Sequence, residues 1–193
     1  MDISSESIEI TGDSILFFDF DGTLLNTDYA NFLAYQEAIS TVLPGKQELV
    51  FNPRGRFTRD SLKVMFHDLS EKDYNYIIEE KRRCYSNYLN KVLLINRVVD
   101  ILFKYSGTNR VILVTNADKD RVEITLNYFQ LLDKFDNIFC NQGNGNKYQY
   151  AILYFEINPK NIIVFENEKC EIKKAFDAGV SSLVHIKSEE FCY

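Results

Sequence analysis

Short runs of apolar residues separated by polar segments are the dominant pattern along this chain. A strand that is buried on both faces shows no alternation of polar and apolar side chains, so continuous apolar runs predict strands of a covered sheet. Such runs cover residues 14–20, 110–115, 161–165 and 182–186, and a weaker run covers residues 137–140. The first of these predicted strands leads directly into a carboxylate.

Amphipathic segments follow the later strands and predict helices. Residues 118–129, 148–155 and 168–178 carry apolar side chains at helical spacing, and Gly179 is a typical helix stop. Because strands that alternate with helices form a parallel sheet with helices on both faces, we expect an α/β, Rossmann-like fold. Right-handed crossovers place the loops after the strands along one edge of the sheet, where functional groups should gather.

Residues 26–96 interrupt this alternation, because they contain no segment with a clear strand pattern. Helices are expected at residues 28–42, at residues 59–67 after a Thr58 N-cap, and from a capping box at Ser70 to about residue 90. We therefore expect a small all-helical cap, inserted directly after the first strand and suited to act as a lid.

The expected domain organisation follows from these two patterns. Residues 14–25 and 97–193 should form the Rossmann-like core, and residues 26–96 the helical cap. Residues 1–13 are polar and acidic, and we interpret them as an N-terminal leader.

Composition narrows the classes of protein that fit. Of the 193 residues, 46% are hydrophobic and 26% charged, which excludes a disordered or coiled-coil chain. The formal net charge is -6, whereas a nucleic-acid-binding protein usually carries an excess of basic residues. No apolar run is long enough to span a bilayer, and the acidic first residues differ from a signal peptide. We therefore expect a cytoplasmic protein with no nucleic-acid or membrane partner.

Cysteine and histidine are too scattered to suggest a zinc site or a cysteine–histidine catalytic pair. The chain has no Cys-x-x-Cys motif, and its two histidines lie in unrelated segments. The residues concerned are Cys84, Cys140, Cys170, Cys192, His67 and His185. We interpret the cysteines as small, reduced hydrophobic side chains.

Two carboxylates, Asp19 and Asp21, stand two residues apart at the end of the first predicted strand. Two buried like charges disfavour each other unless a cation compensates them, and Mg²⁺ prefers such oxygen ligands. Gly22 allows a sharp turn and a close approach of the backbone to a ligand. The alternative is a solvated, Asp-rich turn at a strand end.

The segment from Asp19 to Leu24, Asp-Phe-Asp-Gly-Thr-Leu, resembles the first motif of the haloacid dehalogenase superfamily. Most members of that family are Mg²⁺-dependent phosphatases, and the resemblance is to the phosphatase and phosphoglucomutase-like branch with a small helical cap. It implies that Asp19 is the nucleophile, which becomes an aspartyl phosphate, and that Asp21 is the acid and base.

Later segments are similar to the second and third motifs of that family. The strand end Leu113-Val114-Thr115-Asn116 implies that Thr115 and Asn116 bind the transferring phosphoryl group; the alternative is a strand end that caps the next helix. Lys147 matches the lysine that neutralises the nucleophile and phosphoryl oxygens. Where many relatives continue with proline, this chain has Tyr148.

The fourth motif is matched in its framework and altered at one position. Val164-Phe165-Glu166-Asn167 parallels the family's Val-Phe-Glu-Asp, in which the Asp is a Mg²⁺ ligand, so the resemblance implies Asn167 as a ligand beside Asp19 and Asp21. Glu166 and Glu171 are further candidate metal ligands that would offset the lost charge. The alternative is a charged first helical turn, because acids there are favoured by the helix dipole.

The cap gives the only hints about the substrate. Arg56 and Arg59, with Arg54, could bind an anionic or hydroxyl-rich part of it, or could form a solvated basic loop. The short cap favours a small phosphorylated metabolite as the substrate, and we expect a monomer or weak homodimer.

Three functions remain open at this point. The first is a Mg²⁺-dependent phosphomonoesterase that uses an aspartyl-phosphate intermediate. The second is a phosphosugar mutase similar to β-phosphoglucomutase. The third is a phospho-ligand binding protein in which Asn167 has weakened catalysis.

Overall fold

The computed structural model describes residues 9–45, 49–53, 55–141, 143 and 145–187. These residues divide into two compact units. Unit 1 holds the described residues up to Leu25 and from Leu94 onward, and unit 2 holds those between Asn26 and Leu93. Most of the predicted leader lies outside the described residues.

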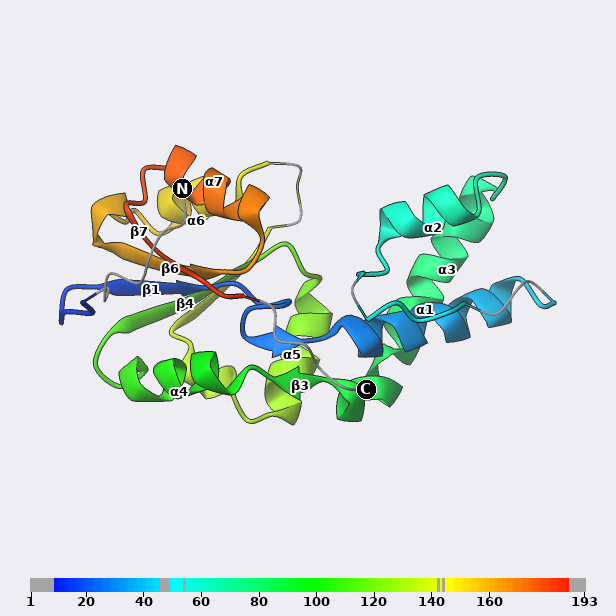
Figure 1. The fold of residues 1–193 in the computed structure, drawn as a ribbon, viewed down its shortest axis with the longest axis horizontal. Helices are drawn as coiled ribbons and strands as arrows, with labels where there is room; N and C mark the ends of the chain where they lie inside the picture. Colours follow the sequence, from blue (N-terminus) through cyan, green and yellow to red (C-terminus); the bar gives the residue numbers. More distant parts are fainter. Residues whose placement is uncertain (1–8, 46–48, 54, 142, 144, 188–193) are drawn as a thin grey trace. The chain divides into compact units, whose positions relative to one another are not determined.

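Unit 1 is built on a parallel sheet whose strand order is β5-β4-β1-β6-β7 (Figure 1). Its strands are β1 (Ile15–Phe18), β4 (Arg110–Thr115), β5 (Asn137–Cys140), β6 (Ile162–Glu166) and β7 (Ser182–His185). Each lies within about two residues of a predicted strand, and the α/β, Rossmann-like fold is confirmed. The strands were predictable because apolar side chains cover both faces of the sheet.

Four α-helices cover this sheet, α6 and α7 on one face and α4 and α5 on the other (Figure 1). Their bounds are α4 (Asn96–Tyr105), α5 (Lys119–Tyr128), α6 (Lys147–Tyr154) and α7 (Lys169–Asp177), with short 3-10 turns η2 (Leu132–Lys134) and η3 (Pro159–Asn161). The helix α4 was not among the predicted helices, although its buried Val98, Val99 and Leu102 have helical spacing.

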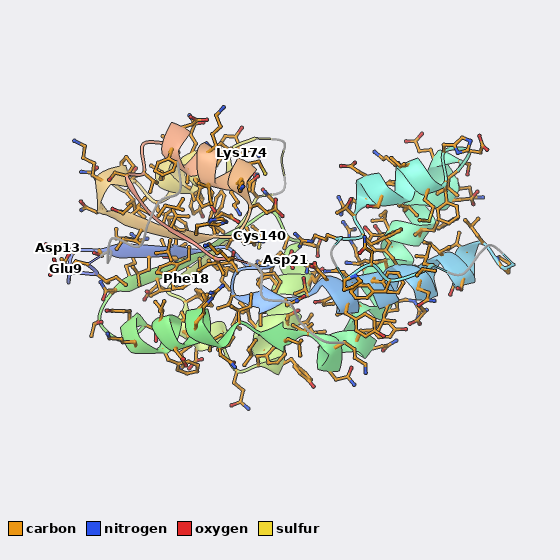
Figure 2. The ribbon with its side chains drawn as sticks, in the orientation of Figure 1. Glu9, Asp13, Phe18, Asp21, Cys140 and Lys174 are labelled. Carbon is orange, nitrogen blue, oxygen red and sulfur yellow. The ribbon has the colours of Figure 1, made fainter. Side chains whose placement is uncertain are left out.

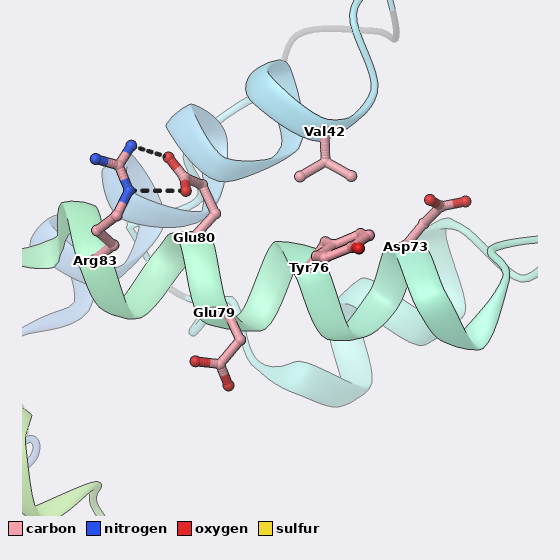
Figure 3. Close-up of a pocket in the computed structure, with 6 residues that line it drawn as sticks. All are labelled: Val42, Asp73, Tyr76, Glu79, Glu80 and Arg83. Atoms are coloured by element: carbon pink, nitrogen blue, oxygen red, sulfur yellow. Dashed lines mark hydrogen bonds and ion pairs between the residues drawn. The ribbon is translucent and has the colours of Figure 1, made fainter.

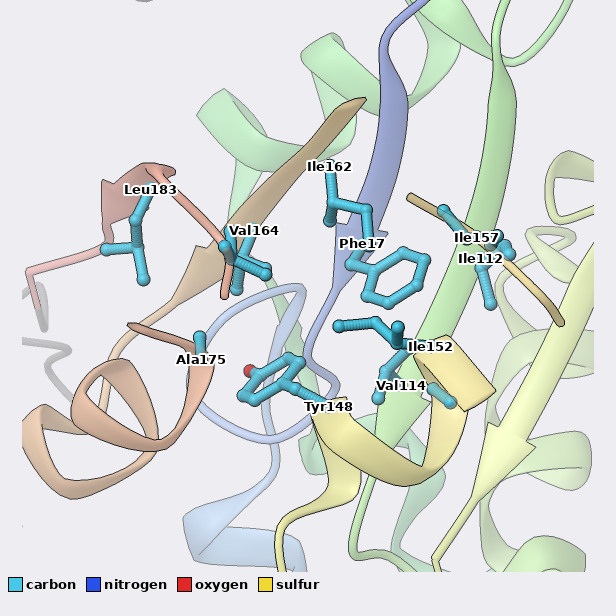
Figure 4. Packing of buried hydrophobic residues seen from close by; sticks show 12 residues of the cluster. Phe17, Ile112, Val114, Tyr148, Ile152, Ile157, Ile162, Val164, Ala175 and Leu183 are labelled. Atoms are coloured by element: carbon cyan, nitrogen blue, oxygen red, sulfur yellow. The ribbon is translucent and has the colours of Figure 1, made fainter. Parts of the chain in front are cut away.

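The central strand β1 is buried on both faces. Phe17 packs with Ile112, Val114 and side chains of α6 and α7 (Figure 4). On the opposite face Phe18 stacks on Phe165, with ring centroids 4.4 Å apart. Tight packing on both faces fixes the residue that follows β1.

The strand ends of β1 and its neighbours meet at one edge. Phe18 is in register with Leu113 of β4 and with Phe165 of β6. Asp19 N–H then donates to the Phe165 carbonyl oxygen at 3.1 Å, which continues the pairing by one residue. Figure 2 shows Asp21 beyond the end of β1. The predicted gathering of loops at the carboxyl edge is therefore present.

Unit 2 is helical. Its elements are α1 (Asp28–Val42), α2 (Arg59–Met65), α3 (Glu71–Cys84) and the 3-10 helix η1 (Tyr85–Lys91). The chain passes between the units through β2 (Leu25–Asn26) and β3 (Leu93–Leu94), which form a two-stranded sheet. These strands are too short to leave a periodic pattern in the sequence.

The helices of unit 2 pack around their own apolar core, which includes Phe32, Leu62 and Ile77. The predicted Thr58 N-cap is present, since Ser61 N–H donates to Thr58 Oγ1 at 3.2 Å. Ser70 caps α3 in the same way by accepting from Asp73 N–H. That helix was expected to reach about residue 90, but its last turns tighten into η1.

Two further expectations concern the whole chain. Among the residues that the structure describes, no helix has the length and apolar character needed to cross a bilayer. The cysteines Cys84, Cys140 and Cys170 are free thiols. Burial raises the pKa of Cys84 and of Cys140 to about 11, which agrees with the interpretation of these residues as small, reduced hydrophobic side chains.

Candidate active site

Asp19 and Lys147 form a buried ion pair at the carboxyl edge of the sheet. Lys147, the first residue of α6, donates from Nζ to Asp19 Oδ1 at 2.5 Å. The Asn146 side chain caps this helix by accepting from Tyr148 N–H at 3.0 Å. Because Lys147 is only 2% exposed, the helix start carries its ammonium into the site instead of into solvent.

The same ammonium also binds Glu166, the last residue of β6. Lys147 Nζ donates to Glu166 Oε2 at 2.9 Å. Burial alone would lower the pKa of Lys147, but Asp19 and Glu166 outweigh it and raise that pKa above its usual value. Burial raises the pKa of Asp19, Lys147 opposes the rise, and Glu166 adds to it. One cation therefore serves two buried carboxylates.

Glu166 is fully buried, and donors surround its carboxylate. Besides Lys147, the Tyr148 hydroxyl donates to Oε2 at 2.6 Å. Oε1 accepts from the backbone N–H groups of Asn167, at 2.7 Å, and Glu168, at 2.9 Å. These contacts orient Glu166 to hold Lys147. Sequence reasoning missed Tyr148 as a site residue, although its place after Lys147, where relatives often have proline, was a visible signal.

Asp21 is held by an arginine that the sequence did not reveal. Arg121 of α5 donates from Nη1 to Asp21 Oδ1 at 2.8 Å and from Nη2 to Oδ2 at 2.5 Å. Both side chains are largely buried, at 12% exposed for Arg121 and 11% for Asp21. The guanidinium also lies 5.4 Å from the centre of the Phe20 ring. This is the two-pronged geometry in which arginine binds carboxylates most strongly.

Asn167 lies against the turn that carries Asp21. Thr23 Oγ1 lies 3.0 Å from Asn167 Oδ1 as placed, and the neighbouring oxygens favour the exchanged orientation, in which the amide nitrogen faces them. The nitrogen lies 3.0 Å from Thr23 Oγ1, 3.0 Å from Glu166 Oε1 and 3.2 Å from the Asp21 carbonyl oxygen, and its two N–H bonds can serve two of these three acceptors. At this predicted metal-ligand position, therefore, an N–H donor faces the neighbouring oxygens.

Glu171, another predicted metal ligand, lies in the first turn of α7 and is 7% exposed. Its Oε1 accepts from Lys174 Nζ at 2.7 Å, whereas its Oε2 has no hydrogen-bond partner in the described part of the chain. Within that same part, no three acidic, cysteine or histidine side chains cluster in a way that could hold a metal ion.

Thr115 and Asn116 follow β4, the strand next to β1. Thr115 is buried, and its Oγ1 accepts from Ala117 N–H at 3.1 Å, so it does cap the turn that follows the strand. The hydroxyl proton is not used in that bond. Asn116 Oδ1 accepts from Asn141 Nδ2 at 3.0 Å, which fixes the amide at the start of the loop. Their role in phosphate binding stays a prediction.

Arg56 and Arg59, the predicted substrate-binding arginines, belong to unit 2. Arg56 Nε pairs with Asp28 Oδ1 at 3.3 Å, and both side chains are about one-third exposed. Arg59 begins α2 and is exposed. Arg54 lies outside the described residues. The assignment of these arginines to the substrate stays a prediction.

Unit 2 also contains an open hollow of about 550 Å³ (Figure 3). Its polar lining is mainly acidic, and its one arginine, Arg83, is bound to Glu80, with Nε donating to Oε2 at 2.9 Å. The lining residues are Val42, Asp73, Tyr76, Glu79, Glu80 and Arg83. An acidic lining repels phosphorylated ligands, so this hollow does not resemble a phosphate site.

Replacing Gly22 with alanine should destabilise the protein by about 1–2 kcal/mol or more. Gly22 has a φ of +81°, and a Cβ there would lie 2.5 Å from a side-chain atom of Asn167. The change would therefore strain the backbone and displace Asn167. Urea unfolding measures the loss.

Gly107→Ala is the matched control, because a Cβ at Gly107 meets no atom within 4 Å. Equal unfolding free energies for the Gly22→Ala and Gly107→Ala variants would contradict the described turn.

Comparison with known families gives a match over most of the chain. Residues 16–185 match the family model described as "Haloacid dehalogenase-like hydrolase". A phosphorylated carbohydrates phosphatase of Thermotoga maritima is 26% identical over 180 residues, which cover 87% of this chain and 82% of that protein.

Solved structures share the fold at lower sequence identity. A predicted phosphoglycolate phosphatase from Haemophilus somnus superposes with a TM-score of 0.74 at 21% identity, covering 92% of this chain and 86% of that one. A putative β-phosphoglucomutase from Thermotoga maritima gives a TM-score of 0.66 at 22% identity, with 89% and 84% coverage. Likeness at this level of identity establishes the fold.

Proposed function

This chain belongs to the haloacid dehalogenase-like hydrolase family, and from that membership we propose that it hydrolyses the phosphomonoester bond of small phosphorylated carbohydrates. The observation that carries the proposal is the buried Asp19, held at the carboxyl edge of the sheet by Lys147. The relative named a phosphorylated carbohydrates phosphatase supports the substrate class. The confirmed family makes the chain a hydrolase of the phosphatase type.

In the first step an oxygen of Asp19 attacks phosphorus. A bond forms between this oxygen and phosphorus, the bond to the sugar oxygen breaks, and the leaving oxygen takes a proton. Lys147 offsets the negative charge shared by Asp19 and the phosphoryl group. We assign the binding of phosphoryl oxygens to the Thr115 hydroxyl and the Asn116 amide, which follow the strand next to β1. In the second step water attacks phosphorus and frees Asp19.

Asp21 is the proposed source and acceptor of the proton in these two steps. Both of its carboxylate oxygens accept from Arg121 in the structure. Each carboxylate oxygen has two lone-pair sites, so one contact to Arg121 leaves a site on each oxygen that can carry a proton. The guanidinium favours the ionised form of Asp21, which opposes its role as the acid and supports its role as the base.

The resemblance implied Mg²⁺ as the cofactor, and the side chains present test that expectation. When bound in such a site, Mg²⁺ supplies positive charge to the phosphoryl group. In this chain both carboxylate oxygens of Asp21 and of Glu166 already accept hydrogen bonds, Asp19 Oδ1 accepts from Lys147, and Asn167 presents N–H to the Asp21 carbonyl oxygen. This donor set does not fit a bound Mg²⁺ in the described arrangement. No step above is therefore assigned to it.

Phosphate release from a panel of hexose and pentose phosphates, with p-nitrophenyl phosphate as a general substrate, tests the proposed function. Borohydride reduces an acyl phosphate to the alcohol, so treatment during turnover should convert Asp19 to homoserine, detectable by mass spectrometry. Transfer of the phosphoryl group to a second sugar hydroxyl would indicate the mutase alternative. Tight phosphate binding without turnover would indicate the binding-protein alternative.

A further inference from the structure

We propose that this active site balances its buried charge with Lys147, Arg121 and the Asn167 amide, and that it binds the phosphoryl group without a divalent cation. The inference rests on the proposed function only in that a phosphate group is the ligand. It is carried by the partners of each buried oxygen at the carboxyl edge of the sheet.

The formal charges at this edge nearly cancel without an added ion. Asp19, Asp21 and Glu166 carry three negative charges, and all three are buried. Lys147 contacts two of these carboxylates and Arg121 contacts the third. The ion pairs thus leave one excess negative charge and no carboxylate without a cation. Buried charges are tolerated when they are paired and hydrogen-bonded in this way.

Asn167 completes this arrangement at the position where a carboxylate would have demanded a cation. An aspartate there would raise the count to four buried negative charges against two positive charges, a deficit that one more divalent ion would reduce. The amide instead adds no charge and donates to the Asp21 carbonyl oxygen and to Glu166 Oε1. Its N–H bonds thus serve neighbouring oxygens without adding charge to the site.

Arg121 is the second independent part of the arrangement, and it is not interchangeable with a surface arginine. Its side chain is 12% exposed, it makes both bonds of a forked ion pair, and it lies against the Phe20 ring. A metal ion at Asp21 would compete with this guanidinium for the carboxylate oxygens. The guanidinium is permanently charged and belongs to the same chain, so it compensates the charge of Asp21 without an ion from solution.

One buried oxygen is not accounted for by these contacts. Glu171 Oε2 has no hydrogen-bond partner among the described residues, while Oε1 binds Lys174. A single carboxylate oxygen falls short of the six oxygen ligands that Mg²⁺ requires, unless water or phosphate supplies the rest. Glu171 therefore marks the place where a cation would first be detected if the proposal were wrong.

The test compares metal and phosphate binding in the wild type and in Asn167→Asp. After EDTA treatment and desalting, calorimetry should show inorganic phosphate binding to the wild type with the same affinity with and without MgCl₂. No Mg²⁺ binding should be seen for the free protein. In Asn167→Asp, Mg²⁺ should bind and should strengthen phosphate binding by about tenfold.

Asn127→Asp is the matched control, since it adds the same charge at an exposed position at the end of α5 in the same unit. It should behave as the wild type. If the wild type binds Mg²⁺ and needs it for phosphate binding, the proposal is overturned. Loss of that Mg²⁺ binding in Glu171→Gln would then identify the missed ligand.

Arg121 provides a second arm of the test. Arg121→Gln should weaken phosphate binding in EDTA, and added MgCl₂ should restore part of it because Asp21 is then open to a cation. Lys119→Gln removes one charge from the same helix at an exposed position. It should change neither the affinity for phosphate in EDTA nor the effect of added MgCl₂. Equal behaviour of the Arg121→Gln and Lys119→Gln variants would overturn the role given to Arg121.

These binding measurements separate the present inference from the proposed function. Cation-independent phosphate binding by a protein that releases no phosphate from any ester would contradict the phosphatase and leave the charge arrangement standing. Phosphate release that stops in EDTA and returns with MgCl₂ would establish the phosphatase and refute the inference.

Discussion

Replacing Asp19 with asparagine is expected to lower the rate of phosphate release by about 10³-fold or more, because the amide cannot attack phosphorus. The change keeps the shape of the side chain. It also removes one of the two negative charges that share Lys147, leaving a one-to-one pair with Glu166. The unfolding free energy should therefore stay the same or rise. A catalytic loss without a loss of stability distinguishes a nucleophile from a structural residue.

The measurement is phosphate release under single-turnover conditions, with urea unfolding of the same preparations. Asp120→Asn is the matched control, since Asp120 is exposed in the first turn of α5. The control should retain the wild-type rate. Turnover in Asp19→Asn equal to that of the control would exclude Asp19 as the nucleophile. Borohydride treatment of the wild type would then convert a different aspartate, or none, to homoserine.

The fold could be predicted largely from the sequence because the sheet is covered on both faces. Runs such as residues 162–165 have no polar interruption, and a turn that contains two carboxylates follows the first run. Asp19 and Lys147 were identified because each lies in a motif that resembles the family's, and these motifs occur in the expected order along the chain. Burial then explains their proximity, since β1 and the start of α6 are both anchored by the same apolar cluster.

The partners that complete the site were not predictable in this way. Arg121 lies 100 residues from Asp21, and nothing in its local sequence distinguishes it from other arginines on exposed helix faces. Only the packing of α5 against the sheet shows that its guanidinium points inward. The amide of Asn167 poses a similar problem, because an asparagine can present oxygen or nitrogen and the choice depends on three neighbouring groups. Sequence identified the position and the surroundings determine its chemistry.

Replacing Lys147 with methionine should destabilise the protein by about 3–5 kcal/mol, the range seen when one partner of a buried ion pair is removed. Methionine has a similar length and no charge, so Asp19 and Glu166 would remain buried with no cation between them. Activity should fall with stability, because the phosphoryl group loses the same positive charge. Urea unfolding measures the loss, and the exposed Lys119→Met is the matched control, expected to change stability by less than about 0.5 kcal/mol.

The double variant Lys147→Met with Asp19→Asn decides whether that loss arises from uncompensated charge. If it does, removal of the Asp19 charge should restore part of the lost stability, and the two changes should deviate from additivity by about 0.5–3 kcal/mol. Additive effects would mean that the Asp19 charge does not contribute to the loss in Lys147→Met. Because Glu166 also contacts the ammonium, rescue should be incomplete, and adding Glu166→Gln should recover more. The unfolding free energies of the single, double and triple variants therefore show how much of the Lys147 charge compensates Asp19 and how much compensates Glu166.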